Sequence, residues 1–151
     1  MHSVEELNAL DSSVETIIVD NNGCNDRSFT VLNLTRFVNL KVFEVGDYSF
    51  SYVNEVHMIG LPELERVVIG EKSFSQYKIY FYDYPSGEFY LKDCDNLREL
   101  RIGESSFINY VSCVIEDNSR LEVVEMGKFR WWSDSFCYAS LELKSCPYEM
   151  K

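Results

Sequence analysis

An eleven-residue phrase recurs along this chain and constrains its fold more than any other feature. It reads LKVFEVGDYSF over 40–50, LERVVIGEKSF over 64–74 and LRELRIGESSF over 97–107. Degraded copies read VETIIVDNNGC over 14–24 and LEVVEMGKFRW over 121–131. Successive copies start 26, 24, 33 and 24 residues apart. A regular repeat of this length is typical of a solenoid, in which each copy forms one coil.

Apolar and polar residues alternate through the first six positions of the phrase, as in a short strand with one buried face. A second alternating segment separates each copy from the next, so every coil is expected to contain two strands. One coil cannot bury its apolar face alone, whereas stacked coils can. The inward positions one, four and six hold Val14, Ile17, Val19, Leu40, Phe43, Val45, Leu64, Val67, Ile69, Leu97, Leu100, Ile102, Leu121, Val124 and Met126.

The second half of the phrase contains a glycine, a serine and an aromatic residue. We expect the glycines to adopt positive φ or to let the next coil's backbone pass closely. The serines are expected to bond backbone groups in the bend, and the aromatic rings to stack as a column through the core. These residues are Gly46, Gly70, Gly103 and Gly127, then Ser49, Ser73 and Ser106, then Phe50, Phe74, Phe107 and Trp131.

This phrase, L-x-x-φ-x-φ with an apolar residue at position eleven, resembles the leucine-rich repeat. Its Ser-Phe ending and 24-residue spacing are most similar to the BspA-like type, which is common in bacterial surface proteins and in large protist families. The resemblance covers about 14–147 and implies one right-handed, mainly β solenoid domain over 1–151. We expect about five coils with strands on both faces. The asparagine usual at position nine is absent from most copies, where Asn22, Tyr48, Lys72, Ser105 and Phe129 stand.

The two ends of the chain differ from its middle. Residues 1–13 are expected to form an N-terminal cap, in which Ser3 and Glu6 make a capping box that opens a short helix through Leu10. The last half-coil, with Leu141, Leu143 and Cys146, has no comparable lid. An open sheet edge can pair with another chain, so we expect edge-to-edge association at the C-terminal end.

Composition narrows the classes of function. The net charge is −11, which disfavours nucleic acid and anionic membrane surfaces because both require a basic field. No apolar run approaches the roughly 18 residues of a membrane span, and the acidic start is unlike a signal peptide, so we expect an intracellular, cytoplasmic chain. Five cysteines without a CxxC spacing predict buried thiols. We find no catalytic, phosphate-binding, dinucleotide or metal-ligand motif, and therefore expect no cofactor and no enzymatic activity.

The third coil carries nine extra residues, since it spans 33 residues against 24. Alternating segments on either side of a Tyr-Pro-Ser-Gly turn predict a β-hairpin over about 77–88. Tyr80, Tyr82 and Tyr84 would share one face of this hairpin. They could bind a partner, because tyrosine provides contact area at low entropic cost, or they could fold back and cover the aromatic column.

The solvent side of the first sheet is the second candidate site. Down position two the charges alternate in sign. At position three Arg66 would lie beside Glu99, and at position five Arg101 would lie beside Glu125. This face could be a recognition surface, or a self-neutralised ladder that holds the register of the strands. The position-two residues are Glu15, Lys41, Glu65, Arg98 and Glu122.

These observations predict a non-enzymatic leucine-rich-repeat module that binds a protein partner through a sheet face or the hairpin. The partner-binding candidates are Tyr80, Tyr82, Tyr84, Arg66, Glu99 and Arg101. A surface or adhesin-type repeat protein is the alternative, and a glycan at Asn33 would point to it. An enzyme of unrecognised type is a third and weaker hypothesis.

Overall fold

The structure is a computed structural model that describes residues 1–75, 86–127, 135–136 and 139–144. Its strands form two parallel five-stranded sheets, called here sheet A and sheet B. Sheet A contains, in spatial order, β1 (Thr16–Val19), β3 (Val42–Val45), β5 (Arg66–Ile69), β7 (Glu99–Ile102) and β9 (Val123–Met126). Sheet B contains β2 (Val31–Asn33), β4 (Glu55–Ile59), β6 (Gly87–Lys92), β8 (Tyr110–Glu116) and β10 (Ser140–Lys144).

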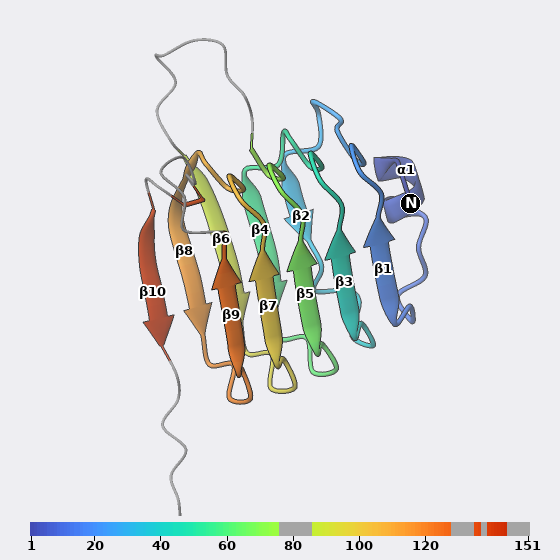
Figure 1. Cartoon of the computed structure of the whole chain (residues 1–151). Coiled ribbons are helices and arrows are strands. Elements are labelled where there is room, and N and C mark those ends of the chain that lie inside the picture. Colours follow the sequence, from blue (N-terminus) through green and yellow to red (C-terminus); the bar gives the residue numbers. More distant parts are fainter. Residues whose placement is uncertain (76–85, 128–134, 137–138, 145–151) are drawn as a thin grey trace, which may run out of the picture.

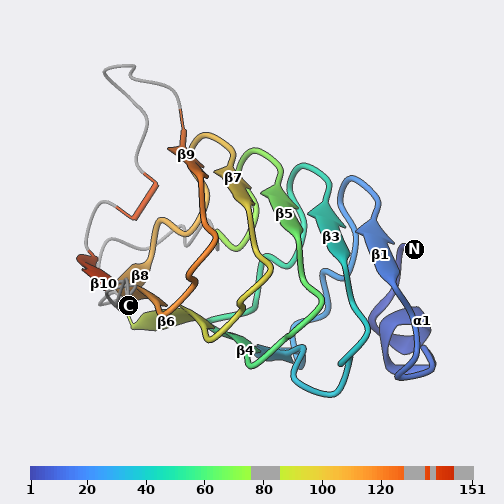
Figure 2. The same ribbon diagram turned by 90° about the horizontal axis from the view of Figure 1, so that it is seen from below.

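The chain passes from one sheet to the other in every repeat and so winds into a β-solenoid (Figure 1). Figure 2 shows the two sheets on opposite sides of the coils. Buried apolar side chains from both sheets form one core cluster. Each copy of the phrase supplies one strand of sheet A, and the segment that follows it supplies one strand of sheet B. The prediction of a mainly β solenoid with strands on both faces and a short N-terminal helix is confirmed.

The strands of sheet A pair in the register that the repeat predicts, so equal positions of the phrase stack on one another. Phe43 pairs with Val67, and Val67 pairs with Leu100. All three are completely buried. The pattern fails in the last coil, where Val124 is exposed although the phrase places it inward. The reason is positional: β9 is the final strand of sheet A and has a neighbour on one side only.

An aromatic column runs through the core, as predicted, but its last member differs from the prediction. Phe50, Phe74 and Phe107 stack with ring centroids 5.0 and 4.6 Å apart. The fourth ring is Phe136, which lies 4.7 Å from Phe107 at an interplanar angle of 7°. Trp131, which was expected in this place, lies outside the described residues.

A ladder of serine hydroxyls links the coils beside this column. Each hydroxyl accepts a hydrogen bond from a backbone amide of the preceding coil and donates one to a carbonyl oxygen of that coil. The serines are Ser49, Ser73, Ser106 and Ser135. Their donors are the amides of Gly23, Ser49, Ser73 and Ser106, at 3.0–3.1 Å. Their acceptors are the carbonyls of Asp20, Gly46, Gly70 and Gly103, at 2.7–3.1 Å. The predicted serine bonds therefore form between coils and not within one bend.

The glycines of the phrase serve close packing more than backbone conformation. Gly127 has the expected positive φ of 70°, but Gly46, Gly70 and Gly103 do not. A Cβ atom placed on Gly103 would lie 2.5 Å from the amide nitrogen of Glu71. The close approach is thus real, but it involves the preceding coil and not the next one. Positive φ also occurs at positions nine and eleven, for example 54° at both Lys72 and Phe74.

The N-terminal end of the solenoid is covered. Helix α1 (Val4–Asn8) begins at Ser3, whose hydroxyl accepts from the amide of Glu6 at 3.2 Å. The Glu6 carboxylate accepts from the amide of His2 at 3.1 Å, one residue before the N-cap, so only the Ser3 half of the predicted capping box is formed. Val4 and Leu7 of α1 are buried against the first coil. The helix ends two residues earlier than expected.

Candidate functional site

The charged face of sheet A brings together the three predicted site residues that the structure describes. Arg66 lies 2.9 Å from Glu44 and 3.5 Å from Glu99. Arg101 forms ion pairs with Glu99 on its own strand and with Glu125 on the next strand. The hydrogen bond from Arg101 lowers the pKa of the Glu99 carboxyl below its usual value. The five side chains form one continuous chain of alternating charge across four strands.

This pairing favours the ladder interpretation of sheet A. Two further pairs, Lys41 with Glu15 at 3.0 Å and Arg98 with Glu122 at 2.9 Å, continue the pattern at position two. Each exposed pair contributes only ~0–1 kcal/mol to stability. Both arginines already have carboxylate partners, so a ligand that binds there must first displace them.

The tyrosine insert is the other candidate site that the sequence predicts. Tyr80, Tyr82 and Tyr84 lie outside the described residues. The last residues of the predicted hairpin, Gly87 and Glu88, belong to β6 and are therefore part of the stack. The rest of the predicted hairpin, over 77–85, lies outside the described residues, so the hairpin stays a prediction.

The outer face of sheet B carries a cluster that the sequence analysis did not identify. His57 and Tyr90 occupy paired positions on β4 and β6, and their rings stack 5.3 Å apart at 16°. His57 Nε2 lies 2.6 Å from a carboxylate oxygen of Glu55, and the Tyr90 hydroxyl donates to Glu88 at 3.0 Å. Glu55 and Glu88 are themselves paired in register. These four residues are called here the His57–Tyr90 patch.

The patch differs from sheet A in how its charge is balanced. Its two carboxylates have a histidine and a tyrosine as hydrogen-bond partners, and neither forms an ion pair with a Lys or Arg in the part of the chain that the structure describes. All four side chains are half-buried. Burial and the hydrogen bond to Glu88 raise the pKa of Tyr90, so it is a neutral hydroxyl near neutral pH. The patch therefore combines apolar ring surface with negative charge.

A signal for this patch was present in the sequence. The strand segments EVHMI and EFYLK both have the order Glu, inward apolar residue, outward aromatic ring. The insert separates the two segments in the sequence. That their residues occupy equal positions becomes clear only from the register of β4 and β6.

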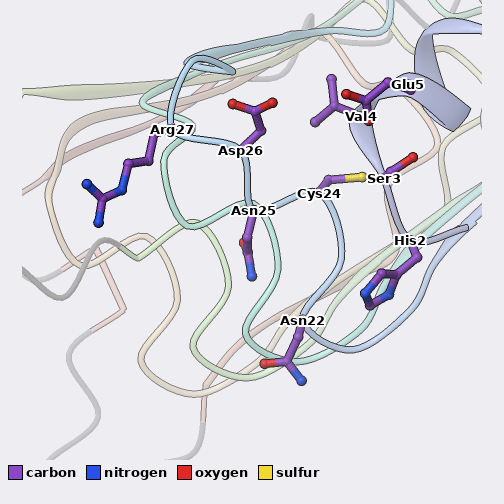
Figure 3. A pocket seen from close by; sticks show the side chains of 9 residues that line it. All are labelled: His2, Ser3, Val4, Glu5, Asn22, Cys24, Asn25, Asp26 and Arg27. Carbon is purple, nitrogen blue, oxygen red and sulfur yellow. The ribbon is translucent and has the colours of Figure 1, made fainter.

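A hollow of about 570 Å³ lies at the N-terminal end of the solenoid. Figure 3 shows its lining, which comes from the start of the chain and α1 on one side and from the turn after β1 on the other. Burial raises the pKa of the Cys24 thiol in its wall to about 11. The thiolate is the nucleophilic form of cysteine. The raised pKa therefore gives no support to a catalytic pair of Cys24 with a histidine. The nine residues are His2, Ser3, Val4, Glu5, Asn22, Cys24, Asn25, Asp26 and Arg27.

The other described cysteines are also free and buried, as expected of thiols that pack as small apolar groups. Burial raises the pKa of Cys94 to about 11 and that of Cys113 to about 12. Cys137 and Cys146 lie outside the described residues. Over the described ranges, no three His, Cys, Asp or Glu residues are grouped so as to hold a metal ion, and no helix has the length and apolar character to cross a membrane.

No family model matches the chain, and searches of curated proteins and of solved structures also returned no match. The similarity to leucine-rich repeats therefore stays a prediction that depends on the repeated phrase alone.

Proposed function

We propose that this chain is a non-enzymatic protein-interaction module that binds a partner through the outer face of sheet B. The observation that carries the proposal is the His57–Tyr90 patch, where two stacked rings lie beside two carboxylates without a Lys or Arg partner among the described residues. Aromatic rings with a polar group are enriched in protein interfaces. Parallel coils also present an extended, regular surface, which is how solenoids bind their partners.

The chemistry of the patch suggests the kind of partner. Complementary charge steers association and selects among partners, so a segment that carries Lys or Arg suits Glu55 and Glu88. The charged face of sheet A is less suitable, because Arg66 and Arg101 are occupied by neighbouring carboxylates. The leucine-rich-repeat class, proposed on the phrase itself, fits the same role.

The test compares two variants that change the charge equally on opposite faces. The double variant Glu55→Gln with Glu88→Gln removes both patch carboxylates and keeps the hydrogen-bonding shape of the side chains. The control, Glu15→Gln with Glu122→Gln, makes the same change at exposed positions directly before β1 and β9 of sheet A. Affinity capture followed by titration of the purified partner should show binding lost in the first variant and kept in the second.

Two further conditions make this test specific. Binding to a basic segment should weaken as salt concentration rises, because exposed charges are screened. A triple change of Tyr80, Tyr82 and Tyr84 to Ser examines the insert independently. Unchanged binding by the sheet B variant would refute the proposal, and loss of binding only in the tyrosine variant would move the site to the insert.

A further inference from the structure

The C-terminal end of the solenoid exposes the residues that form the core one coil earlier. Val124 is 43% exposed, Leu141 50% and Leu143 61%. The residues paired with them on the preceding strands are Leu100, Cys113 and Ile115, which are 0%, 0% and 3% exposed. These three exposed side chains of β9 and β10 are called here the end face.

The backbone at this end is also unpaired on one side. β9 and β10 are the last strands of their sheets, and each pairs with a single neighbour among the described residues. The outer row of N–H and C=O groups on such an edge is a template for another strand. Apolar side chains and free backbone groups therefore occur together on one surface.

The opposite end of a second copy cannot fill this surface. Strand β1 is bonded along its outer edge by the first residues of the chain: the Met1 amine donates to Ile18 at 2.8 Å, and Asp20 donates to Met1 at 2.8 Å. Helix α1 covers the core beside this edge (Figure 1). Head-to-tail stacking is thus blocked at β1, and the C-terminal end of a second copy is the surface that can extend both sheets at once.

We propose that two copies of this chain associate through their end faces about a two-fold axis. An axis perpendicular to the sheets lets β9 pair with β9 of the second copy and β10 with β10, both antiparallel. Two identical surfaces then close on each other, as in most symmetric dimers. Each sheet continues from one molecule into the other, and the three apolar side chains are removed from water.

Within one copy Lys144 lies 3.3 Å from Glu142 and 4.0 Å from Glu116. The same charges can also pair across the proposed interface, where they select its register. When Leu143 lies opposite Leu143 of the second copy, Glu142 lies opposite Lys144 of that copy, and the converse pair forms by symmetry. Opposite charges in directly opposed positions stabilise an antiparallel pair, whereas like charges destabilise it. The apolar side chains fall on the inner face and the charged side chains on the outer face, as in the coils before them.

We expect the dimer to be weak. A stable interface buries about 800 Å² on each partner, and two strands of four and five residues present a smaller surface. Sedimentation equilibrium from about 10 μM to about 1 mM, a range that corresponds to affinities between micromolar and millimolar, should show the mass rise from that of one chain toward that of two.

Charge exchange tests the interface and its register together. Glu142→Lys alone and Lys144→Glu alone each place like charges opposite one another and should weaken association by about tenfold. The double exchange, Glu142→Lys with Lys144→Glu, should restore it. Glu63→Lys, in the exposed turn before β5, has the same charge change as Glu142→Lys and should leave association unchanged.

Leu143→Lys provides a second measurement that does not depend on register. This exposed position tolerates a long polar side chain, and circular dichroism should show that the variant remains folded. We expect it to be monomeric at all concentrations. A monomeric wild-type protein up to about 1 mM would overturn the proposal. So would association that persists in Leu143→Lys, or a double exchange that associates no better than the single variants.

Discussion

The two ends of this solenoid are built from the same repeat but are completed differently. At the N-terminal end, Val4 and Leu7 cover the first coil and Met1 bonds to the edge of β1. At the C-terminal end, Leu141 and Leu143 occupy inward positions of β10 and remain exposed. The repeat therefore specifies how one coil stacks on the next, but it does not specify where the stack stops. Separate residues outside the phrase are needed for that.

The largest expected effect comes from the middle of the stack, which has a neighbouring coil on each side. Phe107→Ala should lower the free energy of unfolding by about 3–5 kcal/mol, because the ring is completely buried and its removal leaves a cavity. Phe107 contacts the rings of Phe74, Phe89, Tyr110 and Phe136. Phe136→Ala, in the last coil, should cost less. Urea titrations would measure both, and a loss below about 1 kcal/mol for Phe107→Ala would contradict its place in the core.

The contrast between the ends can be measured with the same substitution at both. Leu7→Ala should destabilise by about 2–3 kcal/mol, since Leu7 is buried beneath the cap. Leu143→Ala should change the free energy of unfolding by less than about 0.5 kcal/mol, as exposed positions usually do. The comparison is made at low protein concentration, so that association does not contribute. Equal losses at the two positions would show that the C-terminal end is covered in solution.

The serine ladder should also weaken toward the C-terminal end. Ser73→Ala leaves the amide of Ser49 and the carbonyl of Gly46 without their hydroxyl partner in a buried site, which costs about 1–3 kcal/mol. Ser135→Ala removes the last rung and should cost less. Thermal unfolding would measure both changes, with Ser51→Ala, at a half-buried position in the turn of the preceding coil, as a control. A neutral Ser73→Ala would mean that the ladder contributes nothing to coil stacking.

The smallest effect is expected on the charged face of sheet A. Arg101 lowers the pKa of Glu99, so the folded state binds the proton of this carboxyl less readily than the unfolded chain. The stabilisation is therefore present above the unfolded pKa of Glu99 and is lost as pH falls through the lower, folded value. NMR titration should show a Glu99 pKa below its usual range, returning toward it in Arg101→Gln. A Glu99 pKa that does not respond to Arg101→Gln would contradict the pair.

Much of the candidate site on sheet A followed from the sequence, whereas that on sheet B did not. The pairs Arg66–Glu99 and Arg101–Glu125 were predicted because they occupy equal positions of neighbouring phrases. His57 and Tyr90 also occupy equal positions, but in segments that are less alike and that are separated by the insert. Their stacking became visible only when β4 and β6 were seen in register.

The sequence by itself determined the solenoid, its two faces and most of its core. Alternation along a strand and recurrence of the phrase are properties of the chain, and the inward side chains follow from them directly. They predicted the burial of Phe43, Val67 and Leu100 without reference to any distant residue.

Only the tertiary structure decided where the regular pattern is interrupted. Eight residue positions separate Gly127 from Ser135, against three between Gly103 and Ser106, and local alternation does not identify Ser135 as the next serine of the ladder. The Ser-Phe pair at 135–136 marked the true position of the last ring, but only stacking on Phe107 distinguishes Phe136 from Trp131. The exposure of Val124 has a similar cause. A side chain in a solenoid is buried by the coils on both sides of it, and the sequence of one strand does not show whether both coils are present.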